Sequence, residues 1–287
     1  MRWMDGISEA INYIERNIKE PVTIDDITRH AGLSTYYFQK GFSMLCGWTV
    51  GEYIRLRRLS LAGSELASTD RKIIDIALDY GYDSPDSFTK AFTRFHGVTP
   101  TAVRRDGATL KSFAPLKITI ALQGGNIMDY KIVQKEAFTI MGAGKMFNYE
   151  RSSDEIPAFW AEHYRAGKGE VVCGLYGVCF EASRSANGDE FEYLIADNYD
   201  PHFDVPAGCV TKIIPAHTWA VFPCKGPMPK ALQDVNQKIF SEWLPNNRDY
   251  EITGNYNVEA YGNPEDFPDK TQDANYYSEI WIPVKKI

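Results

Sequence analysis

The sequence of 287 residues lacks the cysteine and histidine patterns that hold metal ions. Its five cysteines are odd in number, no two have the Cys-x-x-Cys spacing, and its five histidines form no ligand-like pair with them. We therefore expect no structural metal and no cofactor, and we expect the thiols to be reduced and buried. The sequence also shows no Ser/His/Asp or Cys/His arrangement for nucleophilic catalysis, which argues against an enzyme and leaves no catalytic residue to name.

Signals for membranes and export are missing as well. The chain does not open with the charged and apolar segments of a secretory signal, and it contains no apolar run of about 18 residues. No segment is of low complexity. These absences predict a cytoplasmic protein that does not bind a membrane.

Positive charge is too scarce for a uniformly basic, nucleic-acid-coating surface. The net charge is −7 and is unevenly distributed: residues 1–110 hold 14 Lys and Arg against 14 Asp and Glu, whereas residues 111–287 hold 17 against 24. The neutral half can bind DNA only through local positive clusters, so its affinity for DNA should fall steeply with salt. The acidic half is not expected to touch DNA.

The sequence does contain an internal repeat, in which residues 22–50 and 71–100 match at an offset of 49 or 50 residues. The matching pairs are Ile27/Ile76, Gly32/Gly81, Ser34/Ser84, Phe38/Phe88, Lys40/Lys90, Phe42/Phe92, Gly47/Gly97 and Thr49/Thr99. Each copy has the pattern of a helix–turn–helix. A duplicated helix–turn–helix suits the reading of two successive turns on one face of DNA.

The first copy predicts two short helices. Thr23, with Asp26 three positions later, opens the first helix, and Gly32 ends it in a left-handed turn. Ser34 is predicted to cap the second helix, on which Phe38 and its apolar neighbours share an inward face. The opposite face is polar and carries a cation, which suits contacts to bases and phosphates. The predicted DNA contacts on that face are Tyr36, Gln39, Lys40 and Ser43.

The second copy behaves alike. Ser84 caps its recognition helix and Pro85 takes the first helical position. Thr89 and Lys90 face outward and are predicted DNA contacts. Asp86 also faces outward, but an acid close to phosphate is unfavourable, so we do not expect it to read a base.

A helix over residues 49–67 is predicted between the two copies. Nineteen helical residues span about 28 Å, somewhat less than the ~34 Å between successive major grooves on one face of DNA. The shortfall suggests that the DNA bends if both recognition helices dock. We predict that Arg58 and Arg71 contact phosphates; the alternative for this arginine-rich helix is an ordinary solvated face.

Several stretches within residues 7–106 match, at the right spacing, one pattern of bacterial DNA-binding domain. They are Ile24–Ile27, Ser34–Phe42, Tyr53–Leu59, Ile73–Ala77 and Ser87–Pro100. With them the segment resembles the AraC/XylS family of transcription regulators. The resemblance implies that the positions of Tyr36, Gln39 and Lys40 touch double-stranded promoter DNA. It also implies that the second recognition helix makes fewer base contacts, and RNA polymerase is a further candidate partner.

A change of pattern near residue 128 predicts a second domain. We divide the chain into a double helix–turn–helix domain at residues 1–110, a linker at 111–127 and a second domain at 128–287. Within the linker, residues 116–122 alternate like a strand, and their pattern does not say to which domain they belong.

The second domain is itself duplicated. Two helices, near 156–165 and 229–244, and strands near 129–147, 171–181, 190–197, 209–223, 252–262 and 276–285 give strand–helix–strand–strand twice. Short echoes support the duplication: Gly174–Val178 resembles Gly254–Val258, and Phe191–Ile195 resembles Ser278–Ile282. Two equivalent halves leave a groove on their pseudo-twofold axis, which suits a ligand. The expected fold class is α+β multidomain, an all-α double helix–turn–helix domain followed by a pseudo-twofold duplicated β-α-β-β domain.

The last strand carries a carboxylate between two aromatic residues. Alternation puts Tyr277, Glu279 and Trp281 on one face. Such a carboxylate is costly to ionise without a partner, and a cationic ligand can supply one. Each aromatic face adds roughly 0.5–2 kcal/mol by cation–π attraction. The alternatives are that this face lies in solvent or that Glu279 pairs with a lysine.

Four stretches of the second domain match a further family pattern. They are Pro157–Trp160, Trp219–Gly226, Ile239–Pro245 and Tyr277–Pro283. With them residues 128–287 resemble the GyrI-like effector-binding domain, and the order of the two domains resembles that of Rob-type regulators. The resemblance implies that Glu279, in the terminal Glu-x-x-x-Pro, faces the pocket of a multidrug sensor. The candidate aromatic walls, each with ordinary core as its alternative, are Trp160, Tyr176, Tyr193, Tyr256 and Trp281.

These observations predict a sequence-specific transcription regulator whose second domain binds a small amphipathic effector, cationic or aromatic. The alternative is a GyrI-like small-molecule hydrolase with Glu279 as the general base, or a module that sequesters ligands. Trp219 and Trp243 are assigned to the core rather than to the pocket. The oligomeric state is left open, because two recognition units in one chain allow a monomer to bind DNA.

Overall fold

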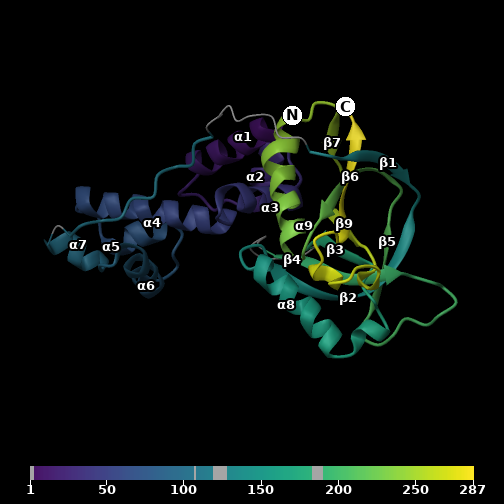
Figure 1. Cartoon of the computed structure of the whole chain (residues 1–287). Coiled ribbons are helices and arrows are strands. Elements are labelled where there is room, and N and C mark those ends of the chain that lie inside the picture. The colour runs from purple at the N-terminus through teal and green to yellow at the C-terminus, as the bar shows by residue number, and fades with distance from the viewer. Residues whose placement is uncertain (1–2, 107, 119–127, 183–189) are drawn as a thin grey trace. The chain divides into compact units, whose positions relative to one another are not determined.

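The computed structural model describes residues 3–106, 108–118, 128–182 and 190–287, and the chain divides into two compact units. Within these described ranges, the first unit holds residues 3–33 and 48–118, and the second holds residues 34–47 and those from 128 onward. Figure 1 labels most of the helices and strands of both units. None of the helices in the described ranges is both long and apolar enough to cross a membrane.

The first unit is helical, as predicted. Its helices are α1 (Trp3–Arg16), α2 (Ile24–Ala31), α4 (Val50–Ser68), α5 (Ile73–Asp79), α6 (Pro85–His96) and α7 (Pro100–Asp106). The Thr23 side chain accepts a hydrogen bond from the N–H of Asp26, and Gly32 ends α2 in the left-handed region with φ 64°. Helix α4 begins with a reciprocal capping box between Thr49 and Glu52. The sequence therefore predicted these boundaries to within a residue or two.

The second helix–turn–helix copy has a core of its own. Side chains from α4, α5, α6 and α7 form one buried cluster, which includes Leu59, Leu66, Ile76, Phe88 and Phe92. Ser84 caps α6 by accepting from the N–H of Ser87, and Pro85 stands in its first turn. These are the capping and inward-facing residues that the repeat predicted.

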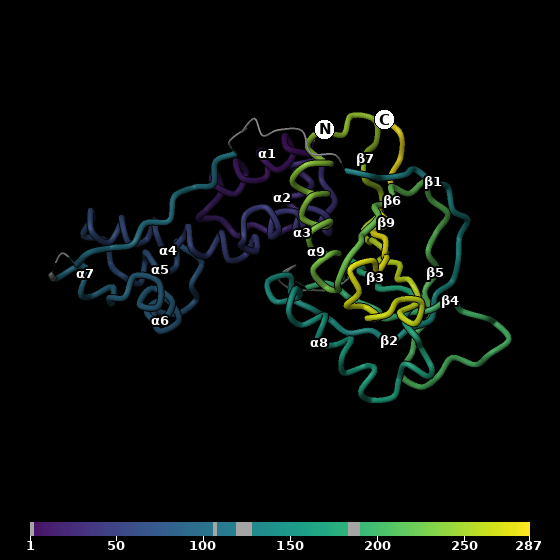
Figure 2. Tube along the Cα trace, in the orientation of Figure 1, coloured from purple at the N-terminus to yellow at the C-terminus, as the bar shows by residue number. Residues whose placement is uncertain are grey.

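The chain after α7 runs back alongside α4 (Figure 2). We call residues 110–116 the strap. The N–H of Lys111 donates to Nδ1 of His96 at 3.2 Å, the N–H of Phe113 to Oγ of Ser60 at 2.9 Å, and the N–H of Leu116 to the Tyr53 hydroxyl at 3.2 Å. Of the strand pattern at 116–122, residues 116–118 lie outside any strand and the rest falls outside the described residues.

The strap makes stability depend on the protonation of His96. The neutral ring is matched to its surroundings, since Nε2 lies 3.0 Å from the carbonyl oxygen of Leu59 while Nδ1 accepts from Lys111. Burial lowers the pKa of His96. The unfolded chain therefore takes up this proton first, and its contribution to stability is lost as the pH falls below the ordinary histidine pKa of about 6.5.

We expect the full chain to lose stability between about pH 7.5 and about pH 5.5, and we expect His96→Gln to lose less over the same interval. The measurement is the urea midpoint of each protein at the two pH values. His202→Gln is the matched control, because His202 is an exposed histidine whose side chain is 87% accessible. Equal losses in wild type and His96→Gln would contradict the assignment.

The second unit is built on one antiparallel sheet. Its strands are β1 (Lys131–Lys135), β2 (Phe138–Asn148), β3 (Tyr176–Glu181), β4 (Glu190–Asn198), β5 (Val210–Ile214), β6 (His217–Lys225), β7 (Tyr250–Ile252), β8 (Tyr256–Tyr261) and β9 (Tyr277–Lys286). Its helices are α3 (Thr35–Cys46), α8 (Ser152–Arg165) and α9 (Lys230–Lys238), and α9 continues through the π-helical turn η2 (Ile239–Trp243) into α10 (Leu244–Asn246). The expected helices and strands are thus present.

The strand order shows the predicted duplication. The strands run β1-β6-β9-β8-β3-β4-β2-β5, with β7 attached to β9. In the duplication, β1 corresponds to β5, β2 to β6, β3 to β8 and β4 to β9. Exchanging each strand with its counterpart gives the same order in reverse. The pseudo-twofold axis therefore passes between β3 and β8, where Gly177 pairs with Glu259 and Cys179 pairs with Asn257.

The two faces of the sheet are covered differently. On one face, strand side chains that include Val258, Trp219 and Trp281 form a buried cluster, which we call the strand-side core. The other face carries Tyr193, Asn257 and Glu259 and is the helix-covered face, because residues of α3, α8 and η2 contact it. Trp219 and Trp243 are both buried, in accordance with their assignment to the core.

The cysteines follow the expectation only in part. Cys179 and Cys224 are buried, and burial raises the pKa of each to about 12. Two others are half-buried. The expectation of buried thiols is wrong for Cys173, which is exposed and whose Sγ lies 3.1 Å from Oδ2 of Asp197.

Candidate functional site

The second recognition helix, α6, presents its predicted contacts to different degrees. Lys90 is exposed and Thr89 is half-buried, and the neighbouring Asp86 is exposed at the start of the helix. Pro85 and Asp86 occupy the first turn, where a recognition helix usually meets base edges. The DNA contacts of Thr89 and Lys90 stay predictions.

The two arginines predicted to contact phosphate have partners within the chain. Arg58 donates from Nε to the carbonyl oxygen of Ile18 and from Nη2 to that of Glu20, both at 2.7 Å. Arg71 lies between Glu65 and Asp79, with Nη1 2.7 Å from Oδ2 of Asp79. Contact of Arg58 or Arg71 with phosphate stays a prediction, and it requires these bonds to be exchanged.

The first recognition helix, α3, does not have the exposed polar face that its spacing predicted. Tyr36 and Gln39 are buried, and Lys40 and Ser43 are half-buried. This face is covered within the chain, because the Tyr36 hydroxyl and the Lys40 ammonium both donate to Oδ1 of Asn257 on β8. Whether these four residues touch DNA stays a prediction.

Glu279 is paired with a lysine, which is one of the alternatives that the sequence left open. Its carboxylate accepts from Nζ of Lys131 at 2.9 Å, from the Tyr277 hydroxyl at 2.8 Å and from Nε1 of Trp281 at 2.7 Å. Burial alone would raise the pKa of Glu279, but these hydrogen bonds hold it below its usual value. The carboxylate therefore already has a counter-charge.

The other half of the domain contains the same ion pair. Lys212 on β5 pairs with Glu192 on β4, just as Lys131 on β1 pairs with Glu279 on β9. Because β5 and β4 correspond to β1 and β9 in the duplication, the two pairs occupy equivalent places. This repetition favours a structural role for the Glu279 pair, and a role of Glu279 in effector binding stays a prediction.

A second carboxylate, which the sequence analysis missed, lies at the centre of the helix-covered face. Glu259 on β8 is 6% exposed, and its Oε2 accepts from the hydroxyls of Tyr193 at 2.8 Å and Tyr261 at 2.7 Å. Trp160 of α8 donates from Nε1 to the Tyr193 hydroxyl at 2.9 Å, and its ring meets that of Tyr261 edge to face at 5.1 Å. We call Glu259, Trp160, Tyr193 and Tyr261 the aromatic cage.

The cage is tightly built around the negative charge. Burial, and then the charge of Glu259, raise the pKa of Tyr193 and of Tyr261 well above the usual tyrosine value, so both hydroxyls stay protonated as donors. A Cβ at position 177 would lie 2.0 Å from the Tyr193 hydroxyl oxygen and 2.7 Å from Oε2 of Glu259. Gly177 on β3 thus makes the room that the two oxygens occupy.

No cation compensates this carboxylate inside the described part of the chain: neither lysine, arginine nor histidine forms an ion pair with Glu259 there. A buried carboxylate without a cation is costly, even when hydroxyls solvate it. The cage thus combines a buried carboxylate with aromatic faces, and a cation beside it would compensate that carboxylate.

The predicted aromatic walls divide between the two faces of the sheet. Trp160 and Tyr193 belong to the cage, whereas Tyr176, Tyr256 and Trp281 pack with the strand-side core. The sequence contained a signal for Glu259 in the run from Tyr256 to Tyr261, because alternation puts Asn257, Glu259 and Tyr261 on one face of a strand.

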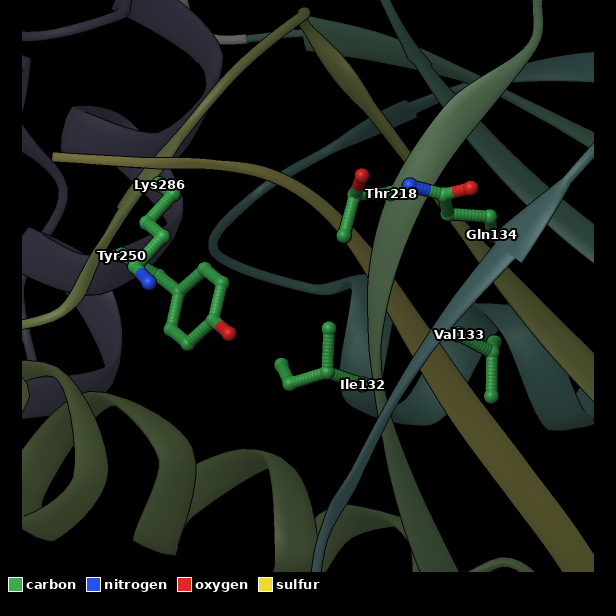
Figure 3. A pocket seen from close by; sticks show the side chains of 6 residues that line it. All are labelled: Ile132, Val133, Gln134, Thr218, Tyr250 and Lys286. Atoms are coloured by element: carbon green, nitrogen blue, oxygen red, sulfur yellow. The ribbon is translucent and has the colours of Figure 1, made fainter.

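A hollow of about 300 Å³ lies beside strand β1 of the second unit (Figure 3). Ile132, Val133 and Gln134 of β1 line it together with Thr218, Tyr250 and Lys286. Figure 3 shows the ring of Tyr250 opposite Ile132, with Lys286 beside the ring. The lining includes a lysine and no carboxylate, so this hollow suits a cation less well than the aromatic cage does.

The helical half has close relatives. A family model described as a helix-turn-helix domain matches residues 27–106. Over 98 residues, 34% of this chain, the sequence is 41% identical to the HTH-type transcriptional activator AarP of Providencia stuartii, of which it covers 73%. The identity is also 41% over 98 residues to the regulatory protein SoxS of Escherichia coli, of which it covers 92%. These relatives place the helical half among DNA-binding regulators of the AraC type.

Residues 131–284 match the Cass2 model, described as an integron-associated effector binding protein. Two solved structures align with part of this chain. SAV2435 bound to tetraphenylphosphonium is 22% identical, with 55% of this chain and 94% of that one covered at a TM-score of 0.47, and an integron cassette protein from Vibrio cholerae is 16% identical, with 54% and 95% covered at 0.41. The match spans more than half of the chain, which therefore belongs to the Cass2 family of effector-binding proteins and, with its AraC-type helix–turn–helix domain, is a DNA-binding transcription regulator.

Proposed function

We propose that the effector of this regulator is a lipophilic cation and that it binds in the aromatic cage with Glu259 as its counter-charge. The observation that carries the proposal is the buried carboxylate of Glu259, which has two tyrosine hydroxyls but no described cation beside it. A guest cation would complete the missing ion pair and bring apolar surface to cover the cage.

Aromatic faces add to this attraction. A cation over an aromatic ring gains about 0.5–2 kcal/mol, the upper end being reached when the site excludes water. The Trp160 and Tyr261 rings stand edge to face, so one of them can present its face to a guest that the other contacts with its edge. A rigid cation with several aryl groups matches such a site better than a small ammonium ion, which would have to shed its water shell.

On the DNA side, we propose that the two helix–turn–helix copies bind a promoter and that RNA polymerase is a further partner. The relatives support the latter in that AarP is named a transcriptional activator. We also propose that the effector is bound and not converted. Recovery of the added cation unchanged after incubation with the chain is the expected result.

The experiment is a titration of the full chain with tetraphenylphosphonium, followed by tryptophan fluorescence. Trp160 lies in the cage, so binding there should change its emission in a saturable way. In parallel, the affinity for a duplex selected by the full chain from a random-sequence pool is measured with and without the cation. Absence of saturable binding would overturn the effector assignment while leaving the DNA-binding assignment standing.

A further inference from the structure

Helix α3 is held on the helix-covered face by the strand that carries Glu259. The Lys40 ammonium donates to Oδ1 of Asn257 at 2.8 Å, and the Tyr36 hydroxyl donates to the same oxygen. The Tyr37 hydroxyl donates to the backbone carbonyl of Tyr256 at 2.7 Å. Three polar side chains of α3, within five residues of one another, therefore donate to two adjacent residues of β8.

Both ends of α3 are attached as well. Ser34 stands at the N-cap of α3 but makes no capping bond to the helix; its hydroxyl instead donates to Oδ1 of Asn255 at 2.7 Å. At the other end, Nε2 of Gln237 donates to the carbonyl oxygen of Met44 at 3.2 Å. Figure 1 shows α3 beside α9, the helix that carries Gln237.

The aromatic residues of α3 are fully enclosed in this contact. The ring of Tyr36 lies 6.4 Å from that of Tyr149, and the ring of Tyr37 lies 6.4 Å from that of Phe240 in η2. Tyr36 and Tyr37 are 0% and 1% exposed. The helix is thus packed on the sheet by apolar burial as well as by hydrogen bonds.

We propose that this contact is an autoinhibitory latch, in which Asn257 holds the DNA-reading side chains of Tyr36 and Lys40 until an effector releases them. The inference rests on the proposed function, since it takes α3 as the DNA-reading helix and the aromatic cage as the effector site. The same two side chains cannot donate to Asn257 and contact a DNA groove at once. DNA and β8 therefore compete for one face of α3.

The hydrogen bonding of the latch is incomplete. Oδ1 of Asn257 accepts two donors, while Nδ2 of the same side chain is buried without a partner among the described residues. Lys40 directs its charge at a neutral oxygen rather than at a carboxylate. Both features make the closed state less stable than a fully paired contact would be, so a smaller difference in effector affinity between the latched and released states suffices to shift it.

The effector site and the latch share a strand. Asn257 and Glu259 are two residues apart on β8 and point to the same face. Cys179 of β3 pairs with Asn257 on one side and with Tyr193 of the cage on the other. A guest that displaces the cage hydroxyls must therefore move groups directly beside Asn257, which gives the effector different affinities for the latched and released states.

The test is the DNA affinity of the full chain, measured by fluorescence anisotropy on a duplex selected from a random-sequence pool. Asn257→Ala is expected to bind the duplex about tenfold more tightly than wild type in the absence of effector, because two hydrogen bonds to α3 are lost. In wild type, tetraphenylphosphonium is expected to tighten binding; in Asn257→Ala it is expected to change little. Asn246→Ala, an exposed asparagine at the end of α10, is the control.

A second variant covers the case in which Asn257→Ala fails to fold. Asn255 is exposed, so Asn255→Ala removes the bond to Ser34 with little risk to the sheet. It is expected to tighten DNA binding in the same direction, about threefold. Hydrogen exchange of peptides from α3 should rise in either variant and in wild type with the cation.

The outcomes separate the latch from the function on which it rests. If neither variant changes DNA affinity or exchange in α3 while wild type still binds DNA and the cation, the latch is overturned and the proposed function stands. If Gln39→Ala and Lys40→Ala leave DNA affinity unchanged, α3 does not read DNA, and the assignment of its face fails instead. Weaker binding by Asn257→Ala would also overturn the latch.

Discussion

We expect Glu259→Gln to bind tetraphenylphosphonium about 30-fold more weakly than wild type, the scale on which a charged hydrogen-bonding partner contributes. Glutamine keeps the shape of the side chain and can still accept from Tyr193 and Tyr261, so the change removes the charge and little else. The measurement is the fluorescence titration already described for wild type. An unchanged midpoint of thermal unfolding shows that the variant is folded.

The matched control is Glu279→Gln. Both glutamates lie on neighbouring strands, but Glu279 already has Lys131 as its partner, whereas no described cation pairs with Glu259. We therefore expect the Glu279 variant to bind the cation within about twofold of wild type. The reverse result would be a large loss of cation affinity in Glu279→Gln and none in Glu259→Gln. It would show that Glu279, in the terminal Glu-x-x-x-Pro, is the counter-charge and that the aromatic cage has only a structural role.

The fold was predictable because its signals are local or repeated. Thr23 and Ser84 cap helices where the sequence placed them, since each acts on a backbone donor three residues away. The cap predicted at Ser34 is wrong, because its side chain makes no capping bond to α3. The duplication of the second domain was visible in short echoes such as Gly174–Val178 and Gly254–Val258. Both echoes begin in the turns that lead into the equivalent strands β3 and β8.

The candidate site was only half predictable, because strand periodicity gives the face of a residue but not what covers that face. Trp160 and Tyr193 were named, and the structure brings them together across α8 and β4. Tyr176 and Trp281 have the same local pattern as Tyr193, yet they pack in the strand-side core. Which face receives a helix depends on contacts between distant segments, and composition alone does not encode it.

The polar face of α3 also shows that spacing does not predict what covers a face. Tyr36 and Lys40 look solvent-exposed by helical spacing, because no apolar residue shares their stripe. Their cover comes from Asn257, more than two hundred residues away in the chain. A polar helix face can be buried when the opposing strand supplies a polar side chain, and periodicity has no signal for that arrangement.

We expect Arg57→Met to lower the free energy of unfolding of the helical unit by about 3 kcal/mol, the scale for breaking a buried ion pair from one side. Arg57 is 7% exposed and donates two hydrogen bonds to the carboxylate of Glu15 on α1, from Nε at 2.8 Å and from Nη2 at 2.7 Å. Its Nη1 donates to the backbone carbonyl of Phe113 in the strap. Methionine preserves the apolar stem but leaves the Glu15 carboxylate with the Tyr53 hydroxyl as its donor, at 2.7 Å.

The measurement is chemical unfolding of the full chain, monitored by circular dichroism at the helical signal, with Arg55→Met as the control. Arg55 is exposed and its nitrogen stands 3.8 Å from Glu52, so its loss should change stability by no more than about 0.5 kcal/mol. The double variant Glu15→Leu/Arg57→Met should recover much of the stability lost in Arg57→Met, because it also removes the Glu15 carboxylate that the single variant leaves unpaired. Equal losses of unfolding free energy in Arg55→Met and Arg57→Met would contradict the stabilising role of the Arg57–Glu15 ion pair.

The three arginines of α4, Arg55, Arg57 and Arg58, have different surroundings that their spacing in the sequence does not predict. Arg57 fastens α4 to α1 and to the strap, and Arg58 fastens it to the carbonyls that follow α1. Arg55 alone of the three is exposed. If Arg55→Met weakens DNA binding and reduces its salt dependence while Arg57→Met acts through stability, the phosphate contact of this helix belongs to Arg55 and not to Arg58.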